Sequence, residues 1–144
     1  MTCEIALVAE PDAALKAIIH DGLRDYNFAT VSPGEVITDL AVAIRSEEGA
    51  VLGGLWGRTA RGWLSIELIF VPESLRGQGI ASRLIACAEE EALRRGCHSA
   101  WLETLNVHAA SLYERLGFAV FGELQNFAPG IPRTFLQKRL TPQP

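Results

Sequence analysis

Hydrophobic and polar positions alternate along the chain in two ways. Apolar residues at helical spacing predict one long helix that opens at Pro11 and Asp12 and another that follows Gly79. Between and after these helices, short apolar runs bounded by turn residues predict strands. The predicted strands cover residues 3–9, 39–46, 51–58, 63–71, 97–104, 118–123 and 134–140.

Turn residues divide the remaining chain. Segments 24–35 and 124–132 are predicted loops, the second turning at Pro129-Gly130. Residues 109–116 are predicted to form a short helix that Gly117 ends. Short turns after residues 46 and 58 favour an antiparallel meander. The order of elements predicts an α/β (α+β) fold with a mixed, mostly antiparallel central sheet of about seven strands, flanked by helices on both faces.

Composition narrows the class of protein. The 144 residues suit a single domain over 1–144 with a frayed tail at 141–144. A net charge of -4 argues against a nucleic-acid partner, and no apolar run has the length of a membrane span. The beginning of the chain does not resemble a secretory signal, and three cysteines without a Cys-x-x-Cys pair suit a reduced compartment. We therefore expect a cytoplasmic protein without a metal, with Cys87 and Cys97 buried.

The stretch RGQGIA, residues 76–81, raises the question of phosphate binding. It lacks the Lys-Ser/Thr pair of a P-loop, and it follows the fourth predicted strand, whereas a dinucleotide fingerprint follows the first. An anion nest at a helix start fits better, because Gly79 allows close backbone approach and Arg76 adds a positive charge. An ordinary turn into a helix is the alternative.

Two longer segments carry a resemblance to a known family. The strand–loop–helix ELIFVPESLRGQGIASRLI resembles the signature of the GCN5-related N-acetyltransferases (GNAT), whose loop binds the pyrophosphate of acetyl-CoA. Further on, LETLNVHAASLYERLGF looks like that family's second signature. Its matching positions are Asn106, Ala109, Tyr113, Gly117 and Phe118. The resemblance covers nearly the whole chain and is to the small single-domain bacterial members.

This resemblance implies a GNAT-like acyl-CoA N-acyltransferase fold and an N-acetyltransferase with acetyl-CoA as co-substrate. The acetyl group would pass directly to a primary amine of a small molecule or peptide. A non-catalytic acyl-CoA-binding or sensor module on the same fold is the alternative, because a fold does not determine an activity. The identity of the amine and the existence of a homodimer are left open.

If the resemblance holds, the sequence offers candidates for the catalytic and binding residues. Tyr113 would donate a proton to the departing thiolate, and Glu67 or Glu103 would deprotonate the amine, directly or through water. The expected acetyl-CoA contacts are Ile69, Phe70, Val71, Arg76, Gly77, Gln78, Gly79, Ile80, Ala81, Ser82, Asn106 and Tyr113. The acceptor side would include Tyr26, Asn27 and Phe28 in the loop after the first helix.

Each of these positions also has a purely structural interpretation. Tyr113 would pack in the core, Asn106 would cap a helix, and either glutamate would form an ion pair. Strand alternation places Glu67 on the same face as Ile69 and Val71. The three tryptophans fall on predicted strands and are assigned to the core. They are Trp56, Trp63 and Trp101.

Overall fold

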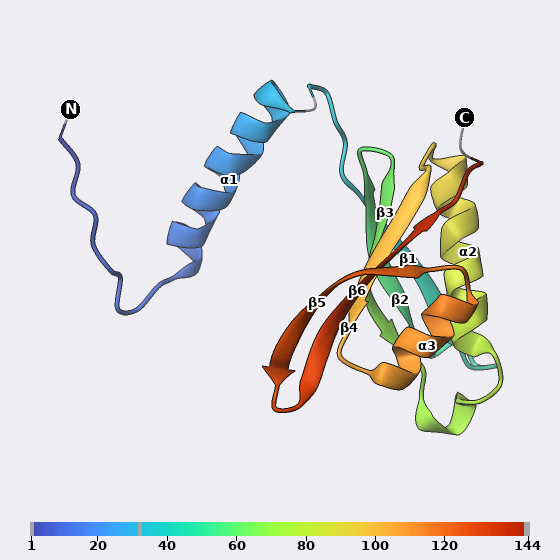
Figure 1. Cartoon of the computed structure of the whole chain (residues 1–144). Helices are drawn as coiled ribbons and strands as arrows, with labels where there is room; N and C mark the ends of the chain where they lie inside the picture. Colours follow the sequence, from blue (N-terminus) through green and yellow to red (C-terminus); the bar gives the residue numbers. More distant parts are fainter. Residues whose placement is uncertain (1, 32, 143–144) are drawn as a thin grey trace. The chain divides into compact units, whose positions relative to one another are not determined.

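The computed structural model describes residues 2–31 and 33–142 (Figure 1). The chain forms two compact units, Met1–Glu35 and Val36–Pro144, each with its own internal contacts. The first unit contains one helix. The second contains every strand of the described residues, together with the loop and helices on which the two sequence signatures fall.

The first unit is built around α1 (Ala13–Thr30). Asp12 caps this helix, because its side chain accepts a hydrogen bond of 2.8 Å from the backbone N–H of Leu15. The predicted strand at 3–9 is wrong, since residues 2–9 have no strand pairing. An apolar run becomes a strand only where another strand satisfies its backbone groups, and sequence pattern cannot supply that partner.

The predicted loop at 24–35 is also wrong in its first half. Helix α1 continues to Thr30, so Tyr26, Asn27 and Phe28 lie in its last two turns. No glycine or proline interrupts the helix between Arg24 and Thr30, which explains why the helical pattern runs on. Residue 32 lies outside the described part of the chain.

The second unit is a six-stranded sheet with the order β1-β2-β3-β4-β6-β5 (Figure 1). The strands are β1 (Thr38–Arg45), β2 (Val51–Ala60), β3 (Trp63–Phe70), β4 (Ser99–Thr104), β5 (Ala119–Ala128) and β6 (Ile131–Arg139). Only β3 and β4 run parallel. The predicted mixed, mostly antiparallel sheet is confirmed, with six strands in place of about seven because residues 3–9 form none.

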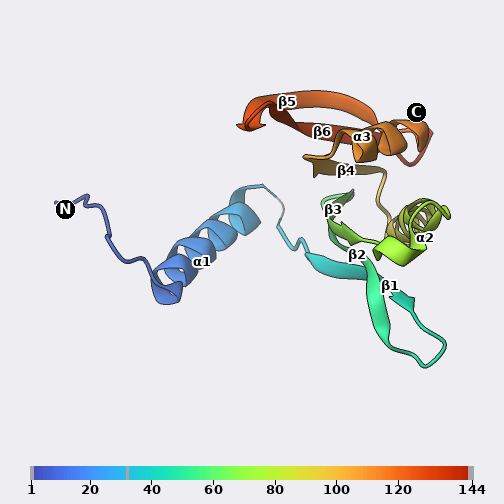
Figure 2. The same cartoon turned by 90° about the horizontal axis from the view of Figure 1, so that it is seen from below.

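One face of this sheet holds the core. Leu64 pairs with Ala100, and Leu102 pairs with Leu136, so these four buried residues point to the same face. Helices α2 (Ile80–Arg94) and α3 (Val107–Arg115) pack there, α2 over β1–β3 and α3 over β4–β6. Figure 2 shows both helices beside the sheet from below. No helix in the described residues is long and apolar enough to cross a membrane.

The C-terminal hairpin is longer than predicted. Segment 124–132, expected to be a loop, belongs mostly to β5 and β6, which turn at Pro129-Gly130 as predicted. A register irregularity between Leu124 and Ala128 accommodates Asn126, whose backbone is left-handed and whose side chain accepts a hydrogen bond of 2.9 Å from the Gly130 N–H. Long-range pairing therefore extends strands across polar residues that local pattern assigns to a loop.

Two smaller expectations have mixed outcomes. Cys97 is buried as predicted, but Cys87 is exposed, because the buried stripe of α2 runs through Leu84, Ile85, Ala88 and Ala92 and Cys87 lies beside it. In the predicted tail, the N–H of Thr141 still donates to the His98 carbonyl at 3.4 Å. Residues 143–144 lie outside the described part.

Candidate functional site

The glycine loop joins β3 to α2 through a short turn of 3-10 helix, Glu73–Leu75. Gly77 (φ 74°) and Gly79 (φ 75°) both have left-handed backbones, which glycine adopts without the steric cost of a Cβ. Arg76 donates from Nε to the Val71 carbonyl at 3.0 Å, and Gln78 donates from its amide to the Ser74 carbonyl at 3.2 Å. These side chains hold the loop in shape.

Helix α2 begins at this loop without a side-chain cap. Its N-cap residue is Gly79, which has no side chain that could accept the first N–H groups of the helix. In contrast, Asp12 caps α1 and Asn106 caps α3. The first N–H groups of a helix have no partner within the helix, so those of α2 are open to an anion.

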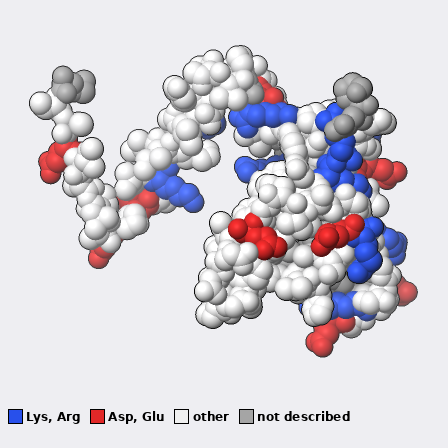
Figure 3. Space-filling model, in the orientation of Figure 1, with Lys and Arg blue, Asp and Glu red and all other residues white. Residues whose placement is uncertain are grey.

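A groove of about 480 Å³ lies between this loop and α3, and we call it the loop groove. Its lining residues are Val71, Leu75, Arg76, Gly77, Gly79, Ile80, Ala81, Ser82, His108, Ala109, Leu112 and Arg115. Two arginines therefore face it, one from the loop and one from α3. On the face of the second unit shown in Figure 3, lysine and arginine side chains are interspersed with acidic ones. Charge and backbone donors together suit a phosphate-bearing ligand.

A second pocket lies where β3 and β4 separate, and we call it the splay pocket. The two strands pair only from Trp63–Ser99 to Ile66–Leu102, although both continue further. The pocket that opens beyond this last pair has a volume of about 280 Å³. It is lined by Ile66, Glu67, Leu68, Ile69, Leu102, Glu103, Thr104, Leu105 and Tyr113. All three predicted catalytic side chains therefore line one pocket.

Both glutamates of the splay pocket are held by arginines from neighbouring strands. Arg58 Nε on β2 lies 2.6 Å from a carboxylate oxygen of Glu67 on β3. Arg133 on β6 donates from Nε to Glu103 on β4 at 2.9 Å and makes a second contact through its terminal nitrogen. The ion-pair interpretation is thus observed for both, and each pair involves a carboxylate that lines the same pocket as Tyr113.

Tyr113 is largely buried, with 9% of its surface exposed. Its ring packs edge-on against Phe118 at a centroid distance of 6.2 Å, and burial raises the pKa of its phenol above the ordinary value. Asn106 caps α3, accepting hydrogen bonds from the backbone N–H groups of His108 (2.9 Å) and Ala109 (3.2 Å). Both structural interpretations are therefore observed, and neither prevents a role toward a ligand, since the cap uses only the amide oxygen of Asn106.

The expected shared face of Glu67, Ile69 and Val71 is wrong for its first member. The register between β2 and β3 shifts at Trp56 and Gly57, which face Leu68 and Ile66, so Glu67 is an extra residue without a directly opposite partner. Such a bulge breaks the alternation of side chains. Glu67 consequently meets Arg58 on the face away from the core, while Ile69 packs against the core.

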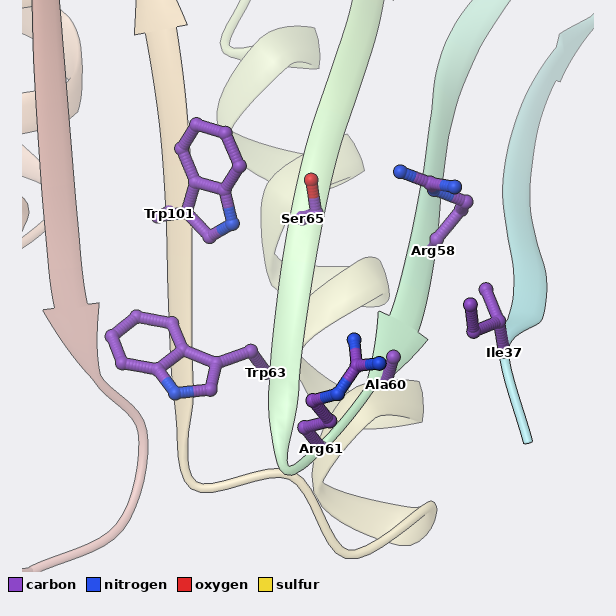
Figure 4. Close-up of a pocket in the computed structure, with 7 residues that line it drawn as sticks. All are labelled: Ile37, Arg58, Ala60, Arg61, Trp63, Ser65 and Trp101. Atoms are coloured by element: carbon purple, nitrogen blue, oxygen red, sulfur yellow. The ribbon is translucent and has the colours of Figure 1, made fainter. Parts of the chain in front are cut away.

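A third hollow was missed by sequence reasoning. Trp63 and Trp101, expected in the core, are half-exposed and lie on the sheet face opposite to α2 and α3. With Ser65, Arg58 and Arg61 they line a hollow of about 240 Å³, which we call the tryptophan hollow (Figure 4). The signal in the sequence was alternation, since each tryptophan stands next to a core residue on its strand.

Comparisons with known proteins agree with this arrangement. The model of the acetyltransferase (GNAT) family matches residues 13–118. An acetyltransferase of Agrobacterium fabrum is 47% identical over 128 residues, which covers 89% of this chain and 93% of that protein. A blasticidin-S acetyltransferase of Streptomyces morookaense is 37% identical over 95 residues, covering 65% of this chain and 70% of that protein.

Solved structures give the same result. A crystal structure from Agrobacterium tumefaciens, of a protein assigned as an acetyltransferase, superposes with a TM-score of 0.89 at 44% identity. The superposition covers 95% of this chain and 99% of the other. The family match extends over well more than half of the sequence, and it includes both signatures and the residues of the loop groove and splay pocket. This chain therefore belongs to the acetyltransferase (GNAT) family of N-acetyltransferases.

Proposed function

We propose that this chain transfers the acetyl group of acetyl-CoA directly to a primary amine of a small molecule or a peptide. One observation carries the proposal: the loop groove and the splay pocket are lined by neighbouring residues of the same two stretches of chain. Val71, just after β3, lies two residues beyond Ile69, and Leu112 directly precedes Tyr113 on α3. A ligand that enters at the glycine loop would thus reach the three candidate catalytic side chains.

The loop groove is suited to the pyrophosphate of coenzyme A. The backbone of residues 76–82 would supply N–H donors, and Arg76 and Arg115 would supply positive charge. Beyond the last β3–β4 pair, the backbone of Ile69, Phe70 and Val71 would bind the extended arm of the molecule as a neighbouring strand does. The amide nitrogen of Asn106 would contact the same arm.

The splay pocket is suited to the transfer itself. Acetyl-CoA supplies the acetyl group as a thioester, whose carbonyl would accept a hydrogen bond from a backbone N–H of residues 69–71. Glu67 or Glu103 would take the proton of the ammonium group, so that the amine can form the C–N bond as the C–S bond breaks. Tyr113 would give its proton to the leaving sulfur. A phenol whose pKa lies above the ordinary tyrosine value is protonated at neutral pH and so carries the proton that this step requires.

We expect Tyr113 to titrate above the ordinary tyrosine pKa of about 10, because its buried site disfavours the phenolate. The chain has two tyrosines, so the variant Tyr26→Phe isolates this signal, which the ultraviolet absorbance of the phenolate reports. Since the pKa is raised in the fold, the stability from the neutral phenol is fully present below about pH 10 and is lost as pH rises through the native pKa. Titration at or below the ordinary value contradicts this assignment.

We expect Gly79→Ala to weaken acetyl-CoA binding about tenfold in calorimetry. A left-handed alanine costs roughly 1–2 kcal/mol, so the loop would leave the geometry that directs its N–H groups into the groove. Gly49→Ala is the matched control, because Gly49 is also left-handed (φ 87°), has open space around its Cα and lies in the β1–β2 turn. Equal affinity in both variants would remove the loop from the binding site.

We expect Tyr113→Phe to lower kcat on the order of a hundredfold, because general acid catalysis typically contributes that much or more. Acetyl-CoA affinity should change little, since the ring and its packing on Phe118 remain. The assay is thiol release with a panel of amines. Tyr26→Phe makes the same change on α1 and should affect the acceptor KM at most.

Two outcomes of this assay would contradict the proposal. Unchanged turnover in Tyr113→Phe would remove the phenol from the mechanism. Tight acetyl-CoA binding without thiol release for any amine would favour a non-catalytic acyl-CoA-binding module.

A further inference from the structure

The loop groove has two walls with different chemistry. One wall is the glycine loop with the first turn of α2, where the uncapped backbone N–H groups lie. The other wall is α3, which contributes His108, Ala109, Leu112 and Arg115. The first wall suits the pyrophosphate of coenzyme A, which leaves the basic side chains of the second wall to be explained.

His108 and Arg115 stand on one side of α3. They are seven residues apart, which is almost two full turns, so both project from the same face, about 10 Å apart along the helix axis. Leu112 lies between them, roughly 6 Å from His108 and roughly 4.5 Å from Arg115 along that axis. A single anionic group over Leu112 is therefore within the reach of both side chains.

Both of these side chains are available to a ligand. They are exposed, and within the described part of the chain neither the Arg115 guanidinium nor the His108 ring has a hydrogen-bond or ion-pair partner. Arg76, in contrast, is engaged through Nε with the Val71 carbonyl. The helix dipole favours a cation at Arg115, in the last turn of α3, but not at His108, in the first. Helix stability therefore accounts for only one of the two.

The balance of charge also sets the loop groove apart. Among the described residues that line it, three are basic and none is acidic. A hollow of about 600 Å³ between β1 and α2 borders the groove at Leu75 and Ile80. Arg45 and Arg83 line this hollow, but so does Glu47, whose carboxylate repels an anion. Of these two neighbouring sites, the loop groove is thus the better one for a second phosphate.

We propose that His108 and Arg115 bind the 3′-phosphate of the coenzyme A moiety and thereby select acetyl-CoA over acetyl donors that lack this group. This inference rests on the proposed function for the donor. Coenzyme A has a diphosphate and, on its ribose, a 3′-phosphate monoester. The glycine loop would bind the first and α3 the second. Acetyl groups on 3′-dephospho-CoA, or on the phosphopantetheine arm of a carrier protein, lack the second.

Calorimetry with acetyl-CoA and acetyl-3′-dephospho-CoA tests this inference, because the two ligands differ only in that phosphate. We expect the unsubstituted chain to bind the dephospho compound about tenfold more weakly at low salt, since hydrogen bonds between a guanidinium and a phosphate are among the strong ones. The difference should decrease as salt is added, because exposed charges are screened.

Three variants locate the contact. Arg115→Gln should weaken acetyl-CoA binding about tenfold and binding of the dephospho compound less than twofold, so that the preference is lost. His108→Gln should reduce the preference about threefold, and Arg115→Lys, which retains the charge, should keep most of it. Arg83→Gln is the matched control, because it replaces an exposed arginine on α2 that does not line the groove, and it should leave the preference unchanged.

The outcomes separate this site from the proposed function. Equal affinity for both ligands, an unchanged preference in Arg115→Gln, or its loss in Arg83→Gln would each overturn the inference, even if thiol release is observed. A preference for acetyl-CoA without thiol release for any amine would support the 3′-phosphate site and contradict the transferase proposal. A folding defect in Arg115→Gln would weaken both ligands alike, and the presence or absence of the threefold loss in His108→Gln then decides.

Discussion

The limited pairing between β3 and β4 is the constraint on which the site depends. The two strands are hydrogen-bonded neighbours only as far as Ile66 and Leu102, and both then continue apart. Backbone groups of β3 that face this opening have no strand partner there, and buried backbone groups need one. The opening is therefore a place where an extended ligand can complete the sheet. The bulge at Glu67 lies at the same point and turns its carboxylate to the face away from the core.

The elements that follow β3 and β4 bring the glycine loop and Tyr113 to this opening. The glycine loop follows β3 directly, and α3 follows β4 after the Asn106 cap. Tyr113 reaches the splay pocket from α3 because this helix packs over β4–β6. At the end of the helix, the Phe118 N–H donates a hydrogen bond of 3.0 Å to the Tyr113 carbonyl. Positions in the two sequence signatures thus become neighbours in space through one local separation of strands.

Local sequence features predicted much of this site. The glycines of the loop, the Asn106 cap and the spacing to Tyr113 are short-range patterns, and each acts within its own helix or turn. The sequence did not reveal which arginines pair with Glu67 and Glu103. Arg58 and Arg133 lie on other strands, and only the sheet register brings them close to the glutamates.

Features that depend on pairing were the least predictable. The bulge at Glu67, the length of the β5–β6 hairpin and the absence of a strand at 3–9 are all decided by partners distant in sequence. The tryptophans were misassigned for a related reason. An aromatic residue on a strand points to one of two faces, and only the sheet shows which face the helices cover.

The most direct test of the central claim is backbone hydrogen exchange with and without acetyl-CoA. If the opening between β3 and β4 receives the extended arm of the ligand, amides of residues 69–71 should become protected together with those of the glycine loop at 76–82, while the β1–β2 turn around Gly49 should exchange as before. Protection of the loop alone, with residues 69–71 unchanged at saturating acetyl-CoA, would contradict the account.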